Sequence, residues 1–332
     1  MQRYDSIGGA MELPAAEIDV APQVPLERLR QKPLSLAVGM FDGVHRGHMA
    51  VIQGALETAK RQGGVPGVLT FWPHPSRLFR PQDPTRMLQP VAQKRARLYR
   101  AGIEFIIWKA FDNAFAAIPA EDFVALVLKS VPGLKSLHVG SNFRFGKGRL
   151  GDAELLAETG KAHGVEVVIT PRLQYDDAAI SSSRIRDCLE RGDMKTVNEL
   201  LGYSYRSQSA LQPGRRLGRM IGFPTLNLPW APELTPRLGV YIVASRRPGE
   251  SAWRPAVANY GVRPTVENAP VEPILEVHLL DGEDVDYVAG EELEVAWHRY
   301  LRPEKKFDGL DALKTQIEAD CHAARAWWKV QR

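Results

Sequence analysis

Two histidines separated by two residues give the sequence its first candidate for chemistry. His45 and His48 lie in the segment GMFDGVHRGH, residues 39–48, between a short apolar run and a helical pattern. This places both imidazoles at a helix N-terminus, where free backbone N–H groups and the helix dipole attract anions. Imidazoles there can donate hydrogen bonds to oxygens that gain charge during in-line attack on phosphorus. Surface turn histidines are the alternative, but the strand-glycine-helix context favours a phosphate site. A metal site lacks a third ligand at suitable spacing.

Three further polar segments each follow a predicted strand. They are residues 71–75 with His74, residues 139–146 with Asn142, and residues 180–186, which carry Ser182, Ser183 and Arg186. Two prolines hold His74 rigidly, and hydroxyls with an arginine at a helix start can bind a triphosphate. Each segment alone also fits a turn residue, a glycine-rich hairpin or a helix cap. Their joint order favours one phosphate-binding site.

The first half of the chain alternates strands and helices that would position these residues. Strands are predicted at 34–39, 65–71, 103–108, 137–140 and 165–169, and helices at 47–62, 91–99, 120–129, 152–162 and from about 183. This alternation predicts a parallel sheet covered on both faces, with ligands at the carboxyl ends of its strands. The sequence has neither a GxxxxGK[ST] nor a GxGxxG motif, so a P-loop or dinucleotide-binding domain is not expected.

After about residue 201 the pattern changes to short β-prone segments separated by Gly and Pro. They cover 205–211, 224–228, 240–245, 255–260, 274–280 and 293–298, and a helix at about 310–328 follows. The pattern predicts a compact six-stranded barrel closed by one helix, in which Trp327 and Trp328 serve as packing anchors. We therefore expect an N-terminal arm at 1–33 and two domains at 34–200 and 201–332.

Composition restricts the class of protein. The 332 residues are 44% apolar and 25% charged, which is typical of a globular chain with two domains. A net charge of +4 is too small to mark a nucleic-acid binder. The cluster Lys94, Arg95, Arg97 and Arg100 is interpreted as a solvated helix face. Cys188 and Cys321 are far apart, and no apolar run approaches the roughly 20 residues that cross a bilayer. A cytoplasmic protein with no membrane partner is expected.

These motifs together resemble one enzyme family. Residues 39–48 resemble the HxGH signature of nucleotidylyltransferases, and Gly222–Asn227 (GFPTLN) resembles the PTxN motif of riboflavin kinases. Over about residues 34–327 the chain is similar to the bifunctional riboflavin kinase/FMN adenylyltransferases, the prokaryotic-type FAD synthetases. The resemblance implies an α/β fold with a Rossmann-like, parallel-sheet nucleotidylyltransferase domain, followed by a six-stranded β-barrel riboflavin kinase domain with a closing helix. It also implies phosphorylation of riboflavin to FMN and adenylylation of FMN to FAD, with ATP as the donor of both groups.

The resemblance also assigns roles to residues. The catalytic residues would be His45, His48 and Glu276, with Glu276 as the base that accepts the riboflavin hydroxyl proton. ATP and its phosphates would contact Gly39, Phe41, Asp42, Gly47, Ser182, Ser183 and Arg186 in the first domain, and Gly214, Gly218 and Arg219 in the second. Flavin would contact His74, Asn142, Arg263 and Arg302. Thr225 and Asn227 would bind Mg²⁺ with substrate phosphates and water, and FMN and FAD would be substrates and products rather than prosthetic groups.

Two other functions remain open from the sequence. In the first, the chain is a monofunctional FMN adenylyltransferase whose barrel only binds flavin, because residues 286–290 match the family's usual segment loosely. In the second, an HxGH-type domain binds RNA, since tRNA-charging enzymes share the histidine motif. No KMSKS-like stretch accompanies it. The expected partners are ATP, riboflavin and FMN, without nucleic acid, and the oligomeric state stays undefined.

Overall fold

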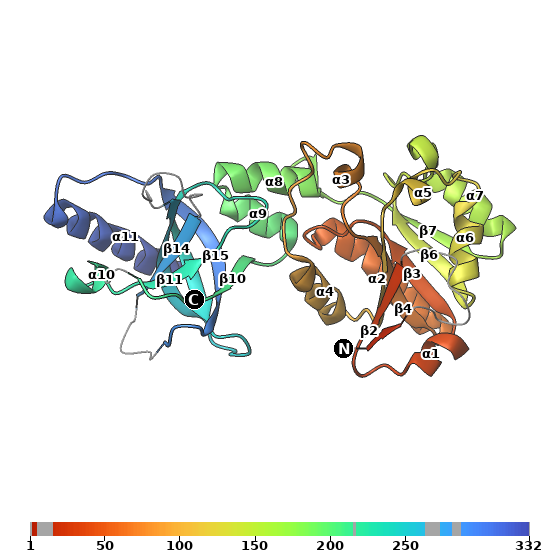
Figure 1. The fold of residues 1–332 in the computed structure, drawn as a ribbon, viewed down its shortest axis with the longest axis horizontal. Helices are drawn as coiled ribbons and strands as arrows, with labels where there is room; N and C mark the ends of the chain where they lie inside the picture. Colours follow the sequence, from red (N-terminus) through yellow and green to blue (C-terminus); the bar gives the residue numbers. More distant parts are fainter. Residues whose placement is uncertain (1, 5–15, 215–216, 263–272, 281–286, 332) are drawn as a thin grey trace. The chain divides into compact units, whose positions relative to one another are not determined.

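The structure is a computed structural model that describes residues 2–4, 16–214, 217–262, 273–280 and 287–331 (Figure 1). It divides into two compact units, Met1–Ser182 and Ser183–Arg332. Each unit has a sheet and a hydrophobic core of its own. Among the described helices, none combines the length and the apolar run that crossing a bilayer requires.

A seven-stranded sheet forms the centre of the first unit. Its strands are β1 (Gln2–Tyr4), β2 (Ala16–Val20), β3 (Leu34–Val38), β4 (Val65–Phe71), β5 (Phe105–Lys109), β6 (Leu134–Gly140) and β7 (Glu166–Thr170), in the order β1-β2-β5-β4-β3-β6-β7. The strands β3 to β7 pair in parallel, which confirms the predicted parallel sheet. At one edge β2 pairs antiparallel with β5, and β1 with β2. Part of the segment 1–33, expected as an arm, thus belongs to the sheet.

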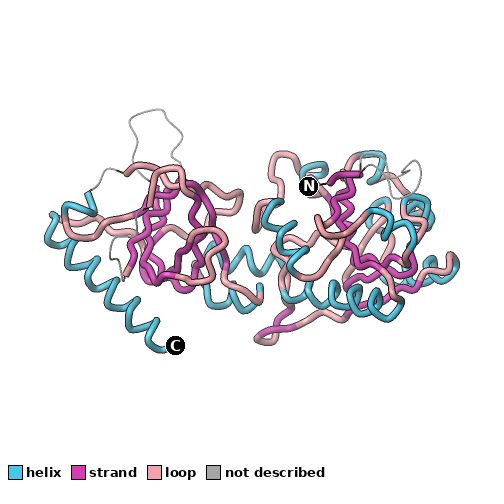
Figure 2. Tube along the Cα trace, turned by 90° about the horizontal axis from the view of Figure 1, so that it is seen from below, coloured by secondary structure: helices cyan, strands magenta, loops and turns pink. Residues whose placement is uncertain are grey.

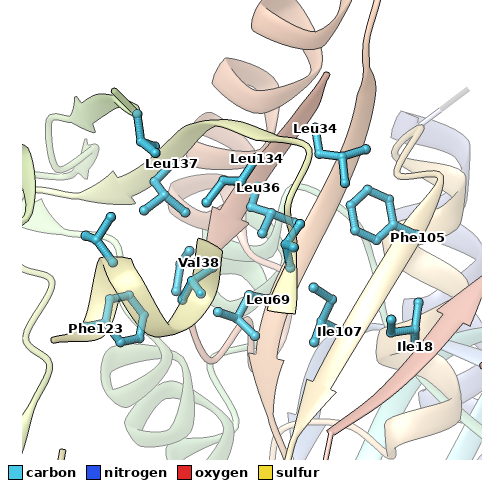
Figure 3. Close-up of a cluster of buried hydrophobic side chains, with 14 of the residues drawn as sticks. Ile18, Leu34, Leu36, Val38, Leu69, Phe105, Ile107, Phe123, Leu134 and Leu137 are labelled. Atoms are coloured by element: carbon cyan, nitrogen blue, oxygen red, sulfur yellow. The ribbon is translucent and has the colours of Figure 1, made fainter. Parts of the chain in front are cut away.

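Helices cover both faces of this sheet. They are α1 (Leu26–Gln31), α2 (Arg46–Gln62), α3 (Ser76–Phe79), α4 (Val91–Arg100), α5 (Asn113–Ala116), α6 (Phe123–Ser130) and α7 (Ala153–Ala162), with a 3₁₀ turn at Lys147–Arg149 and a hairpin of β8 (Gln174–Tyr175) and β9 (Ala178–Ala179). On one face α1, α6 and α7 pack on alternate strand residues such as Leu36, Leu69 and Ile107 (Figure 3). On the other, α2 and α4 pack on Ala37 and Ile106. Because both faces are covered, the central strands β3 and β4 are buried along their whole length and mostly apolar.

The strand order determines where a ligand can bind. β3 lies between β4 and β6 and pairs in parallel with both. The chain passes from β3 to β4 and β5 on one side of β3, and then crosses to β6 and β7 on the other side. Open α/β sheets bind ligands at such a switch point, outside the carboxyl ends of the strands. The segments that follow β3, β4 and β6 are those that carry His45, His74 and Asn142. The topology therefore agrees with the predicted position of the site.

The second unit is a six-stranded antiparallel barrel, as predicted, preceded by two helices. Its elements are α8 (Ser182–Arg191), α9 (Met194–Leu201), β10 (Tyr205–Ala210), α10 (Leu217–Met220), β11 (Leu226–Pro229), β12 (Gly239–Arg246), β13 (Arg254–Val262), β14 (Pro273–Leu279), β15 (Glu292–Arg302) and α11 (Leu310–Gln331). The strand order is β10-β15-β12-β13-β14-β11. A bridge between Gln212 and Asn227 and the bond from Ser209 Oγ to the Pro229 carbonyl, 2.6 Å, join the two end strands. The barrel is thereby nearly closed.

Aromatic side chains fill the barrel, and the last helix covers it. Trp297, Tyr241 and Tyr260 are fully buried and meet at ring-centroid distances of 4.7 and 5.4 Å from Trp297. Outside, Cys321 and Ala324 of α11 belong to a buried cluster with β12 and β13, and Trp327 and Trp328 pack against it. The tube view of the chain shows α11 as one continuous helix (Figure 2). The two tryptophans are packing anchors, as the sequence predicts.

Candidate functional site

His45 and His48 form a stacked pair at the first turn of α2. Their ring centroids are 3.6 Å apart, with an angle of 16° between the planes. His45 is the N-cap of the helix, and its Nδ1 accepts a hydrogen bond of 3.2 Å from the backbone N–H of His48. A neutral His45 therefore carries its proton on Nε2 and can donate from that atom. The pair offers imidazole donors beside a helix N-terminus, as an anion site requires.

The protonation state of His48 is set by its surroundings. Burial, followed by the neighbouring imidazole of His45 and the amine of Lys94, holds the pKa of His48 well below its usual 6.5. The imidazole is therefore neutral at pH 7. Its Nδ1 is buried and has no hydrogen-bond partner among the described residues. A neutral ring can stabilise a phosphate oxygen by donating a hydrogen bond without adding a full charge.

The loop before the histidines is fixed at several points. Phe41 is buried in a left-handed conformation (φ 49°), and its ring meets the His48 ring edge to face at 5.3 Å. The buried carboxylate of Asp42 accepts the Leu88 N–H at 3.0 Å, and its carbonyl accepts from Ser182 Oγ at 2.9 Å. Among the residues predicted to bind ATP, Asp42 and Ser182 thus contact each other. Their contacts position the loop, and the contribution of either residue to ATP binding stays a prediction.

The backbone of Gly47 lies close to the ring of His45. A Cβ on Gly47 would lie 3.1 Å from His45 Cε1 and 3.2 Å from His45 Nδ1. Such contacts are too short for an unmoved ring, so any side chain at residue 47 would displace the imidazole. Gly39 has a similar but looser role, because its Cβ would lie 3.3 Å from the Phe41 ring. The glycines predicted to let a ligand approach also allow this packing of the loop.

Lys94 corrects one sequence-based interpretation. It belongs to the cluster expected on a solvated helix face, but its side chain is 2% exposed. Its Nζ donates to the Met40 carbonyl at 2.6 Å and to Thr70 Oγ1 at 2.7 Å. The signal in the sequence is the spacing from Val91 to Lys94 and Leu98, which lie three and four residues apart. This spacing places Lys94 on the buried face of α4.

His74 and Asn142 follow β4 and β6, as predicted. His74 Nδ1 accepts the Ser76 N–H at 3.1 Å and lies 2.8 Å from Ser76 Oγ, which fixes the ring at the start of α3. Ser76 Oγ in turn accepts the Thr85 N–H at 2.8 Å. Asn142 is exposed beside Gly140. A flavin contact for His74 or Asn142 stays a prediction.

Ser183 and Arg186 lie in the first turns of α8, which starts at Ser182. Both belong to the second unit, and their predicted role in binding ATP stays a prediction. Arg263 lies outside the described residues, and the side chain of Arg219 does too. Their predicted roles in flavin and phosphate binding stay predictions.

A second polar site lies on the barrel, around Thr225 and Asn227. The backbone of Gly214 lies against the Asn227 amide, where a Cβ would approach Nδ2 to 2.2 Å. Gly218 faces the Phe223 carbonyl, which a Cβ would approach to 2.3 Å, and it accepts the Phe223 N–H at 2.7 Å. Because glycine alone fits at both positions, the predicted glycine-rich loop packs directly on the Thr-x-Asn segment. Sequence and structure agree on this loop.

Glu276 lies in the middle of a polar row that crosses three strands. On β14 it is directly opposite Asn227 of β11 and Asn259 of β13. Directly opposite residues share a face of the sheet, and the neighbours Leu275 and Val277 are fully buried on the other face. The predicted base and the predicted metal ligand Asn227 are therefore cross-strand neighbours.

Two contacts around this row were not predicted. His278, two residues from Glu276, has its Nδ1 2.9 Å from the carbonyl of Pro224, the residue before Thr225. Asn259 Nδ2 donates to Glu304 Oε1 at 3.1 Å. The sequence gives a signal only for His278, through its alternation with Glu276.

Arg302 is bound to a carboxylate of the last helix. Its Nε and Nη2 bind the buried Asp320 carboxylate, with distances of 3.0 Å to Oδ1 and 2.7 Å to Oδ2. Arg302 also donates to the Pro303 carbonyl at 3.0 Å. These bonds join β15 to α11, so the arginine has a structural task. Its predicted flavin contact stays a prediction.

The residues that could hold a metal are few. Within the described ranges, no three His, Cys, Asp or Glu side chains are grouped as a metal site. Thr225 and Asn227 provide a hydroxyl and an amide oxygen instead, which are hard ligands of the kind that Mg²⁺ accepts beside phosphate and water. Asn227 Nδ2 is 3.4 Å from the Thr225 carbonyl, so the amide nitrogen faces the backbone. This orientation fits a metal bound through Oδ1.

Fold and sites together define a class. A stacked histidine pair at the switch point of a parallel sheet, and a Thr-x-Asn corner beside a carboxylate on a barrel, are the features of a two-activity enzyme that transfers phosphorus-containing groups. The model of the FAD synthetase family matches residues 27–184, and that of the riboflavin kinase family matches residues 201–328. The chain belongs to the family of bifunctional riboflavin kinase/FMN adenylyltransferases.

Individual relatives agree with this assignment. The chain is 36% identical over 303 residues to the bifunctional riboflavin kinase/FMN adenylyltransferase of Escherichia coli strain K12, covering 91% of this chain and 95% of that protein. It is 37% identical to that of Pseudomonas fluorescens over 292 residues, 87% and 91% of the two chains. A crystal structure described as a macrolide-efflux protein from Streptococcus pneumoniae has a TM-score of 0.79 and 28% identity, and the match covers 92% of this chain and 99% of that one. This last similarity extends to the fold along nearly the whole chain.

Proposed function

We propose that the chain phosphorylates riboflavin to FMN and then adenylylates FMN to FAD, with ATP as the second substrate of each reaction. Residues 34–200 carry out the adenylylation and residues 201–332 the phosphorylation. The observation that supports this proposal is that each unit places two of the predicted catalytic or metal-binding residues next to each other. The histidine pair is stacked at α2 in the first unit, and Glu276 pairs with Asn227 in the second.

In the adenylylation step, an oxygen of the FMN phosphate attacks the α-phosphorus of ATP. A new P–O bond forms as the bond to the bridging oxygen breaks, and pyrophosphate leaves. No protein nucleophile is needed, so the protein contributes alignment and stabilisation of charge. His45, which donates from Nε2, and the neutral His48 stabilise the oxygens that gain charge. The N-terminus of α2 adds the partial charge of its backbone N–H groups.

In the phosphorylation step, the riboflavin 5′-hydroxyl oxygen attacks the γ-phosphorus of ATP, and ADP leaves. Glu276 accepts the hydroxyl proton. Thr225 and Asn227 would hold Mg²⁺ through oxygen, with His278 supporting the backbone before them. When bound, Mg²⁺ neutralises charge on the ATP phosphates. The free, buried Cys188 and Cys321 fit the cytoplasmic location that we propose with this function.

The test is one incubation of the full chain with riboflavin, ATP and Mg²⁺, followed by chromatography of the flavins. We expect FMN and then FAD. Glu276→Gln should stop FMN formation and leave FAD formation from supplied FMN intact. His48→Asn should do the reverse, with each lost step slowed by about 10²-fold or more. A folded wild-type chain that makes FAD from FMN but never FMN from riboflavin would favour the monofunctional alternative. Loss of both steps in either variant would contradict the division of labour.

A further inference from the structure

Lys94 is a buried charged group of the first unit to which the proposed mechanism gives no task. Lys94 is 2% exposed, and an amine is taken out of water at a high cost unless other groups compensate it. Its compensation comes from the Met40 carbonyl and Thr70 Oγ1 at 2.6 and 2.7 Å. The Trp108 ring lies 5.1 Å from Nζ. All three partners lie at or next to the carboxyl ends of β3, β4 and β5.

The bonds of Lys94 end on the loop that carries the histidines. Met40 precedes Phe41, whose left-handed backbone directs its ring against His48. Thr70 Oγ1 also donates to the Met40 carbonyl, at 3.2 Å, so the amine, the hydroxyl and the carbonyl form a closed triangle. This triangle fixes the first turn of the loop from inside the protein. A shift of Met40 would also shift Phe41, whose ring packs against the His48 ring.

Lys94 also acts on the site by charge. Burial lowers the pKa of Lys94 to about 7, against the opposing effect of Asp42. Lys94 is therefore mostly protonated in the range below pH 6.5 in which a histidine would gain its proton. Its charge is the third cause, after burial and His45, that lowers the pKa of His48. The groups that face the amine electrostatically are Asp42 from the loop and His48 from α2.

We propose that Lys94 is a positioning residue for adenylyl transfer: through its hydrogen bonds to the Met40 carbonyl and Thr70 Oγ1 it holds the loop that orients His48. This role rests on the proposed function for its effect on rate. Its effect on the imidazole is independent of any substrate. Lys94 contacts the loop and not the reacting atoms, so it acts through His48.

The test uses Lys94→Met in the full chain, which keeps the length of the side chain and removes the amine. Lys109→Met is the matched control. Lys109 is a second buried lysine of the same unit, and it also donates to a backbone carbonyl, that of Ala110, and lies over an aromatic ring, Phe115. We expect kcat for FAD formation from FMN to fall by about 10²-fold in Lys94→Met, with KM values near those of the wild type. The rate of FMN formation from riboflavin should stay unchanged, which would show that the barrel is folded in the same sample.

A second readout separates positioning from loss of folded protein. In histidine-ring NMR titrations, Lys94→Met should raise the pKa of His48, while Lys109→Met leaves it where it is. In addition, Thr70→Val should lower the same kcat and combine non-additively with Lys94→Met, because both break one triangle. Thr58→Val, at another buried threonine of this unit, should leave that kcat unchanged.

The outcomes distinguish the two proposals. Equal losses in both lysine variants, or an unchanged His48 pKa in Lys94→Met, would overturn the role of Lys94 and leave the proposed function intact. A wild-type chain that makes no FAD would overturn the proposed function. The titration would still decide whether Lys94 controls His48.

Discussion

His45 combines a structural and a chemical task in one ring. Its Nδ1 caps α2 by accepting from the His48 N–H, and in the neutral ring its Nε2 carries the proton and is the donor atom. The helix therefore fixes the orientation of the imidazole and, in the neutral ring, its tautomer. A side chain that caps equally well but has no donor at the Nε2 position would separate the two tasks.

Asn is such a side chain, because it is among the best N-caps, whereas Ala gives no cap. We expect His45→Asn and His45→Ala to slow FAD formation from FMN alike, by about 10²–10³-fold. Only His45→Ala should also lose about 1 kcal/mol of stability, which lowers the Tm of the first unit by about 2–4 °C. Calorimetry of the full chain measures the shift. A His45→Asn enzyme with wild-type activity would show that capping is the only task of the residue.

Single residues could be predicted from the sequence where a motif fixes them, and not where packing does. The histidine spacing was sufficient to place His45 and His48 at the start of α2. Lys94 was assigned to a solvated face because a lysine counts as polar in any periodicity. Its burial depends on Met40 and Thr70, which are 54 and 24 residues away in sequence. No local pattern contains those partners.

The contact between β6 and α2 has a buried histidine at its centre. His138 is fully buried, with Nε2 3.1 Å from Ser136 Oγ, which in turn donates to Ser35 Oγ at 2.8 Å on β3. Its Nδ1 faces Gly54 of α2, where a Cβ would come within 2.9 Å. Burial lowers the pKa of His138 to about 4, and the charge of Arg61 adds to this effect. The packing of helix on sheet therefore requires a neutral ring.

This requirement makes the stability of the first unit dependent on pH. Between pH 6.5 and about 4 the unfolded histidine binds a proton that the folded one does not, so stability falls as the pH drops through this window. The loss from His138 alone is about 3 kcal/mol at its largest. We expect His138→Gln to reduce the slope of Tm against pH in this range. His163→Gln, at an exposed histidine of the same unit, should leave the slope unchanged. Equal slopes in wild type and His138→Gln would contradict the prediction.

The elements themselves were largely predictable because each follows from a local pattern. The apolar runs that became β3 and β4 and the alternation at Glu276 in β14 lie within a few residues of the expected limits. β2 was not predicted as a strand. Its pairing partner β5 lies about 90 residues further on, and a strand of only five residues has little pattern of its own.

At the level of the complete chain, two separate sites predict two separable activities. Gly47→Ala should displace His45 and stop only FAD formation, and Gly214→Ala should displace the Asn227 amide and stop only FMN formation. FMN made by one chain can diffuse to another. We therefore expect a mixture of the two variants to convert riboflavin to FAD, although neither does so alone. Chromatography of the flavins is the measurement, and a mixture that stops at FMN would show that the intermediate must stay with the chain that made it.

The division of the chain into a parallel-sheet unit and a barrel was predictable from the change of pattern near residue 201. The compact units meet at Ser182 and Ser183, so that α9 and nearly all of α8, which continue the helical pattern of the first half, are grouped with the barrel. Helical periodicity shows that a face is buried, and it does not show against which sheet.

Asn227 couples ligand affinity to the pairing that closes the barrel. Its carbonyl accepts the Gln212 N–H at 2.9 Å where β10 and β11 meet, and its side chain is the proposed metal ligand. Local opening of a protein needs least free energy where few hydrogen bonds pair the strands. A nucleotide that binds only when Gln212 and Asn227 are paired stabilises that pairing by its binding free energy. By reciprocity, a substitution that weakens this pairing lowers the affinity for nucleotide, even when the substituted residue does not contact the ligand.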